Sequence, residues 1–389
     1  MTPLPRVALL VENSRAYGRQ LLRGVARYAR MHGPWAFYAR GLFYRKSASG
    51  RNELAQIRQW RPDGVIARDS EPIEQMRAWG IPIIIASAVD NTLTDMYRII
   101  TNDQAIGEMA ADHLYQRGFR NFAYCGYPEM FWSTHRGDSF RKALIRRDMD
   151  VLVYDPPRNR RDWTWQREQT HLAHWVGGLP KPTAIMACND DRAQQIAEAC
   201  IIAGRRVPYD VAILGVDDDD QVCDLANPSL TSVRLSVEHA GYTAASILAQ
   251  LMDGEKLSEV QVVVIDPVSV VRRESTDFLA VEDELVRKGL KYIRSHAPQP
   301  LQINDVAAAL GVSRRSLHDR FRAVLGFTVH EEIKRARIDL IADLLAHSDL
   351  SITQIAEKMG FAGSDHLSRY FKQEMHRTPR EFRKLHLNK

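Results

Sequence analysis

The chain has 389 residues, of which 45% are hydrophobic and 26% charged, and its formal net charge at pH 7 is +5. This length exceeds what one hydrophobic core usually supports, so we expect a globular protein of two or three domains. No apolar run reaches the roughly 18–20 residues of a membrane span, and the first residues lack the apolar stretch of a secretory signal, which favours a cytoplasmic protein without a membrane partner. Its four cysteines show no CxxC spacing, which indicates buried free thiols and neither a zinc site nor a disulfide framework.

Positive charge is concentrated at the C-terminal end. Residues 281–389 hold 19 of the 53 Lys and Arg residues but only 14 of the 48 Asp and Glu residues, so they carry the whole excess of +5. A basic segment is expected where a protein meets phosphate groups, although a solvated basic helix surface would give the same count.

Short β-branched runs alternate with amphipathic stretches over the first 275 residues. Helical periodicity is clear in residues 18–32, 103–118 and 190–206, where apolar side chains recur at i, i+3 and i+4. This alternation predicts parallel sheets covered on both faces, and the length favours two α/β lobes with a cleft between them. Ligands bind such folds at the carboxyl ends of the strands. The candidate strands include residues 6–11, 63–67, 81–86, 121–126, 183–189 and 211–217.

The alternation of strands and helices stops near residue 276. Residues 281–296 predict one amphipathic helix, and the APQP stretch at 297–300 separates it from an all-helical remainder. We place the boundary between Ser275 and Asp283. The expected division is an α/β domain over residues 1–276, a linker that includes a helix over 277–300, and a helical domain over 301–389.

The helical remainder contains two helix-turn-helix patterns in tandem, at residues 305–326 and 351–379, joined by a predicted helix at 329–347. Each pattern has an apolar helix, a glycine-containing turn and a second helix with basic side chains. The expected N-cap of the second helix is Ser313 in the first unit and Ser364 or Asp365 in the second. The side chains expected to be buried are Leu317, Phe321 and Val324, then Leu367, Tyr370 or Phe371, and Met375.

Polar and basic side chains on the exposed faces of these second helices are the candidate DNA contacts. Arginine can bind a guanine edge through two hydrogen bonds and also binds phosphate, so double-stranded promoter DNA is the indicated partner. A rigid connecting helix would hold the two helices at a fixed separation, which suits successive major grooves. Any single one of these residues could instead belong to a solvated helix face. The candidates are Arg314, Arg315, His318 and Arg322 in the first unit and His366, Arg369 and Lys372 in the second.

Over residues 283–386 the sequence resembles the AraC/XylS family of transcription regulators. The most specific part is IAEKMGF, HLSRYFKQEM and TPREFR within residues 355–383, and LGVSRRSLHDRF, Arg337 and Leu344-Leu345 also match. The resemblance implies DNA binding through both units. His376 departs from the family pattern, which usually has Gly in the turn after the second recognition helix. His tolerates a positive φ better than most residues, so we expect this turn to survive.

The α/β part resembles the ligand-binding core of LacI/GalR regulators, which is similar to periplasmic sugar-binding proteins. The strongest match is PTAIMACNDDRA, VPYDVAILGVDDDD and LTSVR, at residues 182–193, 207–220 and 230–234. The ligand contacts that this resemblance implies are Arg136, Asn189 and Asp217, with Trp165, or alternatively Trp163, stacking on the ligand. Residues expected in loops of the first lobe that face the same cleft are Asn13, Tyr17 and Asp103.

These residue types also suit a sugar on chemical grounds. Carboxylates, an amide and a guanidinium pair with vicinal hydroxyls, and an indole face suits the C–H surface of a pyranose. Each also has a structural explanation, with Asn189 as a helix N-cap, Asp217 to Asp220 as a solvated turn and Arg136 in a surface salt bridge. We expect no cofactor and no metal. A sugar-modifying enzyme is a remote alternative, because the sequence lacks a nucleophile elbow, a metal-ligand cluster and a phosphate loop.

A LacI-type sensor ahead of an AraC-type domain, together with residues 12–25, 165–169 and 271–278, resembles the xylose-responsive members of these families. This implies a transcription activator with D-xylose as effector, which acts as a homodimer and works with RNA polymerase. The residues themselves support only a small neutral polyol as ligand. Another pentose or hexose as effector, and repression in place of activation, therefore stay open.

Overall fold

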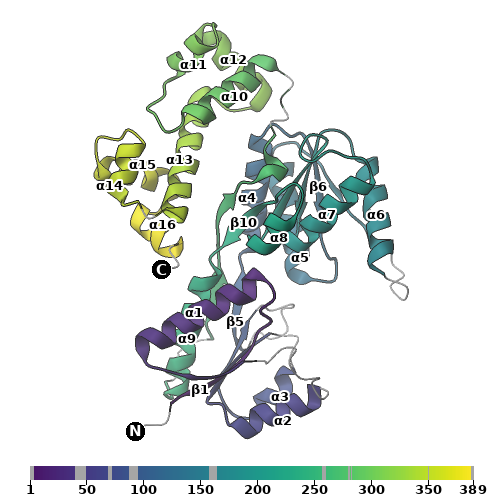
Figure 1. Cartoon of the computed structure of the whole chain (residues 1–389), viewed down its shortest axis with the longest axis vertical. Helices are drawn as coiled ribbons and strands as arrows, with labels where there is room; N and C mark the ends of the chain where they lie inside the picture. The colour runs from purple at the N-terminus through teal and green to yellow at the C-terminus, as the bar shows by residue number, and fades with distance from the viewer. Residues whose placement is uncertain are drawn as a thin grey trace.

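The computed structural model describes residues 4–39, 50–68, 72–86, 95–156, 164–255, 260–278, 281, 283–348 and 350–386. An α/β domain of two lobes, each built on a six-stranded sheet, is followed by a helical domain that lies beside it (Figure 1). The predicted fold class is therefore confirmed. No helix among the residues described is long and apolar enough to cross a bilayer.

The sheet of the first lobe is parallel throughout and has the strand order β11-β5-β4-β3-β1-β2. Its central strands β3 and β4 are buried at every position, because helices cover both faces of the sheet. The strands are β1 (Arg6–Leu10), β2 (Ala36–Ala39), β3 (Gly64–Ala67), β4 (Ile83–Ala86), β5 (Tyr97–Thr101) and β11 (Val262–Ile265), and the helices are α1 (Ala16–His32), α2 (Gly50–Trp60), α3 (Ile73–Arg77) and α9 (Val237–Met252).

The sheet of the second lobe has the order β12-β10-β9-β8-β6-β7, and only its edge strand β12 runs antiparallel to its neighbour among the strands described. The strands are β6 (Asn121–Cys125), β7 (Val151–Val153), β8 (Thr183–Ala187), β9 (Val211–Val216), β10 (Thr231–Leu235) and β12 (Pro267–Val271). The helices are α4 (Asp103–Gln116), α5 (Phe131–Ile145), α6 (Trp165–Gly178), α7 (Asp190–Ile202) and α8 (Asp220–Leu225). All four cysteines, Cys125, Cys188, Cys200 and Cys223, are buried and free, as predicted.

Three crossings of the chain between the lobes form one hydrogen-bonded hinge. They lie at Asn102, after β5, at Ser236, after β10, and at Asp266, between β11 and β12. The side-chain nitrogen of Asn102 donates to Asp266 Oδ1 at 2.9 Å, and the Asp266 backbone N–H donates to Ser236 Oγ at 3.1 Å. A rotation of one lobe against the other must therefore pass through these residues.

Helices α1 and α9 of the first lobe approach each other at backbone distance. A Cβ on Gly24 would lie 2.1 Å from the Glu238 carbonyl oxygen, and one on Gly241 would lie 2.2 Å from the Leu21 carbonyl oxygen. Only glycine fits these two positions.

The helical domain contains the predicted tandem helix-turn-helix arrangement. Its helices are α10 (Glu284–His296), α11 (Ile303–Ala309), α12 (Arg314–Leu325), α13 (Val329–His347), α14 (Ile352–Lys358), α15 (Ser364–Met375) and α16 (Pro379–His386). The connecting helix α13 has the predicted bounds. Helix α10 begins three residues later than predicted, because the Asp283 side chain caps it by accepting from the backbone N–H groups of Leu285 and Val286.

The cap of the first recognition helix was predicted correctly and that of the second was not. Ser313 Oγ accepts from the Ser316 backbone N–H at 3.1 Å and caps α12. Gly363 occupies the N-cap position of α15, so Ser364 and Asp365 are already inside the helix. His376 ends α15 with a φ of +54°, as Gly326 ends α12 with a φ of +82°, which confirms that the turn survives with His.

The buried faces of the recognition helices largely follow the predicted periodicity. Leu317 and Phe321 are fully buried in α12, but Leu325 completes this face and Val324 is only partly buried. In α15 the fully buried pair is Leu367 and Phe371, whereas Tyr370 and Met375 are partly buried at its edge.

Arg337 of α13 holds the two helix-turn-helix units together. Its guanidinium is buried and donates to the carbonyl oxygens of Ala297 at 3.1 Å and Met359 at 2.6 Å, and also to that of Gln299. The match of Arg337 to the AraC/XylS pattern thus has a structural reason.

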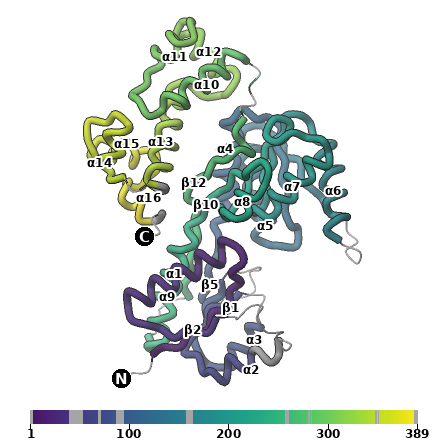
Figure 2. Tube along the Cα trace, viewed as in Figure 1, coloured from purple at the N-terminus to yellow at the C-terminus, as the bar shows by residue number. Residues whose placement is uncertain are grey.

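The helical domain is packed against the second lobe and the hinge. Arg120 Nη2 donates to the Val324 carbonyl oxygen at 2.8 Å, which satisfies a free carbonyl in the last turn of α12. Val268 of β12 belongs to the same apolar cluster as Ile338 and Phe382 of the helical domain. Figure 2 shows the C-terminal helices α13 and α16 next to the path of β12.

Candidate ligand cleft and nucleic-acid interface

A cavity of about 190 Å³ lies between the two lobes of the α/β domain. The first lobe contributes the loop after β1 and the beginning of α1. The second lobe contributes α5, the beginning of α7 and the loop after β9. The predicted ligand residues that line this cavity are Tyr17, Arg136, Asn189 and Asp217.

Arg136 is the buried basic group of this cavity. It is 3% exposed, so the alternative of a surface salt bridge is wrong. Its Nε donates to Asp103 Oδ1 at 3.0 Å and its Nη1 to the Cys188 carbonyl oxygen at 2.7 Å, while Asp217 Oδ1 lies 3.9 Å away. The predicted residue Asp103 therefore lies behind Arg136 and orients its guanidinium.

Asp217 leaves strand β9 with a φ of +104°, a backbone conformation that is rare for a residue with a side chain. Burial raises the pKa of its carboxyl to about 6, and the nearby Asp191 and Asp219 also raise it, whereas Arg136 lowers it. Near neutral pH the ionised, buried carboxylate would be stabilised by a further hydrogen-bond donor. A ligand hydroxyl would supply one.

Asn189 is a helix N-cap, and it also lies where a ligand contact was predicted. Its side-chain oxygen accepts from the Arg192 backbone N–H at 3.0 Å and caps α7, and the residue also lines the cavity. Because the cap uses the oxygen, a ligand contact would be made by the amide nitrogen.

Two arginines near the beginning of α1 tie the lobes together across the cavity. Arg15 Nε donates to both carboxylate oxygens of Asp191, at 2.8 and 2.9 Å, and Arg19 Nη2 donates to Asp219 Oδ1 at 2.7 Å. Asp219 Oδ2 also accepts from the Ala16 backbone N–H at 2.6 Å, so a carboxylate of one lobe caps a helix of the other. These ion pairs were not predicted from the sequence, although two arginines four residues apart beside a predicted helix are a visible signal.

The indole that faces the cavity is Trp132 and not the predicted Trp165. Trp165 begins α6, is 62% exposed and is not part of the cavity wall, so its predicted stacking role has no support in this arrangement. Trp132 lies four residues before Arg136 on α5, and the Arg136 guanidinium carbon is 4.8 Å from its ring centre. Trp163 falls outside the described residues. Asn13 is exposed in the loop after β1 and is not part of the cavity wall.

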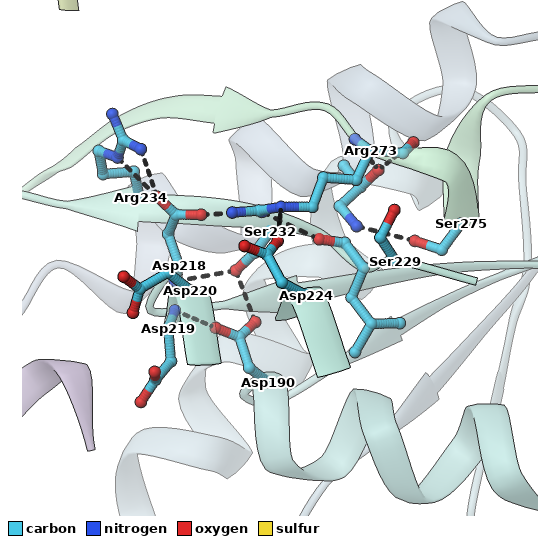
Figure 3. A network of polar contacts seen from close by, with 12 residues as sticks. Asp190, Asp218, Asp219, Asp220, Asp224, Ser229, Ser232, Arg234, Arg273 and Ser275 are labelled. Atoms are coloured by element: carbon cyan, nitrogen blue, oxygen red, sulfur yellow. Dashed lines mark hydrogen bonds and ion pairs between the residues drawn. The ribbon is translucent and has the colours of Figure 1, made fainter. Parts of the chain in front are cut away.

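A buried polar network lies behind the cavity (Figure 3). Asp190 accepts from Ser232 Oγ at 2.6 Å and from the Asp219 backbone N–H at 2.7 Å, and burial raises its pKa well above the usual range. Asp218 accepts from Arg234 Nε at 2.7 Å and from Arg273 Nη1 at 2.9 Å. The network connects the loop after β9 to the end of β12.

The run from Asp217 to Asp220 is therefore no solvated turn. Asp218 and Asp219 are 7% and 2% exposed, and Asp220 alone among the four is exposed. Within the residues that the structure describes, no group of His, Cys, Asp and Glu side chains is placed to hold a metal ion.

The candidate DNA contacts lie on the outer faces of α12 and α15, where all are exposed except His318, which is partly buried. The Arg315 side chain is 93% exposed and only loosely paired with Asp319, at 3.8 Å. Helix α13 separates the two units by 19 residues, or roughly 28 Å at about 1.5 Å per residue, which is near the ~34 Å between successive turns of a major groove. DNA contact by these particular side chains stays a prediction.

Both parts of the chain match known families. Residues 111–276 match the family of periplasmic binding protein-like domains, and residues 306–385 match a family of helix-turn-helix domains. The chain is 31% identical to the xylose operon regulatory protein of Escherichia coli K12, over 97% of this chain and 96% of that protein. It is 30% identical to the xylose operon regulatory protein of Haemophilus influenzae, over 97% and 98% of the two chains. The solved structure of a xylose-binding transcription activator is 30% identical and covers 99% of both chains with a TM-score of 0.61.

Proposed function

The chain belongs to the family of the xylose operon regulatory proteins, and from this we propose that it is a D-xylose-dependent activator of genes for xylose catabolism and transport. It is a sugar-responsive transcription regulator with an AraC-type DNA-binding domain. The observation that carries the proposal is the cavity between the lobes, where a guanidinium, an amide and a carboxylate meet in the same chain as two helix-turn-helix units.

The proposed sugar site combines charged and apolar recognition. Arg136 and the Asn189 amide nitrogen donate to ring or hydroxyl oxygens, and Asp217 accepts from hydroxyls. The Trp132 indole offers an apolar face for the C–H surface of the ring. The volume of about 190 Å³ is below the ~300 Å³ at which pockets for drug-sized ligands begin, which suits a single monosaccharide.

In the proposed mechanism, D-xylose stabilises the closed arrangement of the lobes. The ties from Arg15 to Asp191 and from Arg19 to Asp219 exist only when the lobes are close, so sugar contacts on both sides add to an arrangement that the protein already favours. Closure rotates the hinge against which the helical domain rests. The sugar must bind the DNA-competent conformation more tightly than the other conformation. Because the coupling is reciprocal, the factor by which the sugar raises operator affinity equals the factor by which the operator raises sugar affinity.

Further parts of the proposal follow from this function. The regulator works in the cytoplasm, associates with the nucleoid when bound to DNA, acts as a homodimer and works with RNA polymerase at the promoter. The division into a sensor over residues 1–276, a linker over 277–300 and a DNA-binding domain over 301–389 belongs to the proposal as well. The relatives are transcription regulators, and we expect no turnover of the sugar.

A thermal unfolding screen of the purified full-length protein with single monosaccharides tests the effector. D-xylose at 100-fold its Kd should add about 2.7 kcal/mol of stability, and L-arabinose, D-ribose, D-glucose and D-galactose should add less. Operator binding is then measured with and without saturating D-xylose. Equal operator affinity in both conditions would contradict the proposal that D-xylose controls DNA binding. Conversion of labelled xylose during incubation would show that the protein is an enzyme.

A further inference from the structure

A second cavity, of about 90 Å³, lies between the α/β domain and the helical domain. The end of α4 and the residues after β12 form one wall, and α10 and α13 form the other. None of its lining residues is shared with the cleft between the lobes. The charged side chains of its wall are Arg117, Arg272, Arg294, Arg335, Glu332 and Asp339.

Arg117 is the buried cation of this junction cavity. It is 3% exposed, and its Nη1 has no hydrogen-bond partner among the residues that the structure describes. Its Nε donates to His113 Nε2 at 3.2 Å, so this ring nitrogen is an acceptor and the imidazole is neutral. Burial, together with the nearby Arg294 and Arg272, lowers the pKa of Arg117 to about 9.

The carboxylates on the helical wall of the cavity do little to neutralise the charge of Arg117. Glu332 is 2% exposed and is shared by two guanidiniums, with Arg335 at 2.9 Å and Arg294 at 3.6 Å. Asp339 is exposed at the rim. The four arginines of the wall therefore outnumber its two carboxylates, and the neutral His113 adds no charge of its own.

We propose that the junction cavity binds a small oxyanion of the phosphate type, held between Arg117 and Arg272 of the α/β domain and Arg294 and Arg335 of the helical domain. A buried guanidinium with an unmet donor is costly, and a phosphate group supplies several charged acceptors at once. The volume is several times the ~10–15 Å³ that one water needs, so one tetrahedral oxyanion fits.

The bound anion contacts both domains and stabilises their docked arrangement. This site is separate from the sugar cleft and does not depend on the effector proposed there. The phosphate group has two possible sources, free inorganic phosphate and the phosphate of a sugar monophosphate.

Calorimetry and thermal unfolding of the full-length protein test the site. Titrations use inorganic phosphate and ribose 5-phosphate, at ionic strength balanced with chloride, and ribose as the neutral comparison. We expect at least one phosphate compound to bind and to raise the unfolding midpoint by several degrees, whereas ribose does neither. Binding of free phosphate alone would identify the free ion, and binding of ribose 5-phosphate alone would identify the ester.

Variants separate this site from other basic surfaces. Arg272→Gln removes an exposed side chain and should weaken binding at least tenfold without unfolding the protein, and Arg117→Gln should abolish binding. Arg141→Gln, an exposed residue of α5, makes the same charge change elsewhere and should bind like the parent. Absence of binding by both phosphate compounds, unchanged affinity in Arg272→Gln, or loss of binding in Arg141→Gln would overturn the proposal. The response to D-xylose is measured in the same samples, so failure of one site is distinguishable from failure of the other.

Discussion

The carboxylate of Asp266 at the hinge lies 3.8 Å from the guanidinium of Arg377, two residues after the end of α15. Asp266 also accepts from the Asn102 side chain, so one carboxylate touches a second crossing between the lobes as well as the turn behind the second recognition helix. A hinge rotation therefore changes the surroundings of that turn directly. The contact offers a physical connection between sugar binding and the placement of α15.

Loss of this contact should weaken the dependence of operator binding on D-xylose. The two side chains are 45% and 41% exposed, so the pair contributes at most about 1 kcal/mol, or about a fivefold change. We expect Arg377→Gln to reduce the ratio of operator affinities with and without D-xylose by up to that factor, as measured by fluorescence anisotropy. Asp266→Asn removes the same ion pair. The double variant should therefore show no larger reduction of this affinity ratio than either single variant. Additive losses would contradict the contact as the cause.

Asp217 should destabilise the free protein above pH 6. Its ordinary pKa of 3.8 is raised to about 6 in the folded state, so the carboxyl has no effect on stability below pH 3.8. Stability is lost progressively between pH 3.8 and 6, where the unfolded chain ionises but the folded carboxyl stays protonated, and the loss reaches about 3 kcal/mol above pH 6. We expect Asp217→Asn to raise the unfolding midpoint at pH 8 and to leave it nearly unchanged at pH 4. Asp138→Asn, an exposed carboxyl of α5, is the control and should change neither.

Ionisation of the same carboxyl should strengthen sugar binding, although it lowers the stability of the free protein. Hydroxyl donors prefer the ionised form, so D-xylose affinity should increase from pH 5 to pH 7 in the parent protein. Asp217→Asn should bind more weakly and without this slope, as calorimetry at several pH values can measure. An unchanged slope in the variant would place the titrating group elsewhere.

Trp132 and Trp165 provide a matched pair of substitutions for the stacking role. Trp132→Leu should lower D-xylose affinity about tenfold, since loss of an aromatic face at a buried contact costs on the order of 1 kcal/mol or more. Trp165→Leu removes an exposed indole outside the cavity and should leave the affinity unchanged. The reverse result in calorimetric titrations would restore Trp165 as the stacking residue.

Arg315 and Arg369 should each contribute to operator binding. If either binds a base edge, its replacement by Ala costs about 1–3 kcal/mol and relaxes specificity at one position of the site. If it binds phosphate, affinity falls for all DNA sequences, and the slope of log affinity against log salt concentration becomes shallower by about one. Arg141→Ala is the charge-matched control. Parent-like affinity and slope in both variants would exclude α12 and α15 as the DNA-contacting surfaces.

Sequence patterns predicted the central strands better than the edges of the sheets. β3, β8 and β9 are buried at every position, and apart from Thr183 at the start of β8 they consist of continuous apolar runs. Edge strands such as β7 and β11 are partly exposed, so their side chains carry less of that pattern. The cap at Gly363 was missed for a related reason. Glycine caps a helix without a side-chain hydrogen bond and therefore leaves no local signal beside Ser364.

The sequence by itself determined the order of the two domains and the tandem helix-turn-helix units. Periodicity, caps and strand ends depend on near neighbours in the chain, so these features can be recognised locally. Arg136, Asn189 and Asp217 were expected at the cleft from the resemblance to LacI/GalR regulators, and all three line the cavity. Only the tertiary structure decided that Trp132 faces the cavity, that Arg15 meets Asp191, and that Asp266 meets Arg377. The two ion pairs join residues more than 100 positions apart, and which distant surfaces meet depends on the packing of whole lobes and domains.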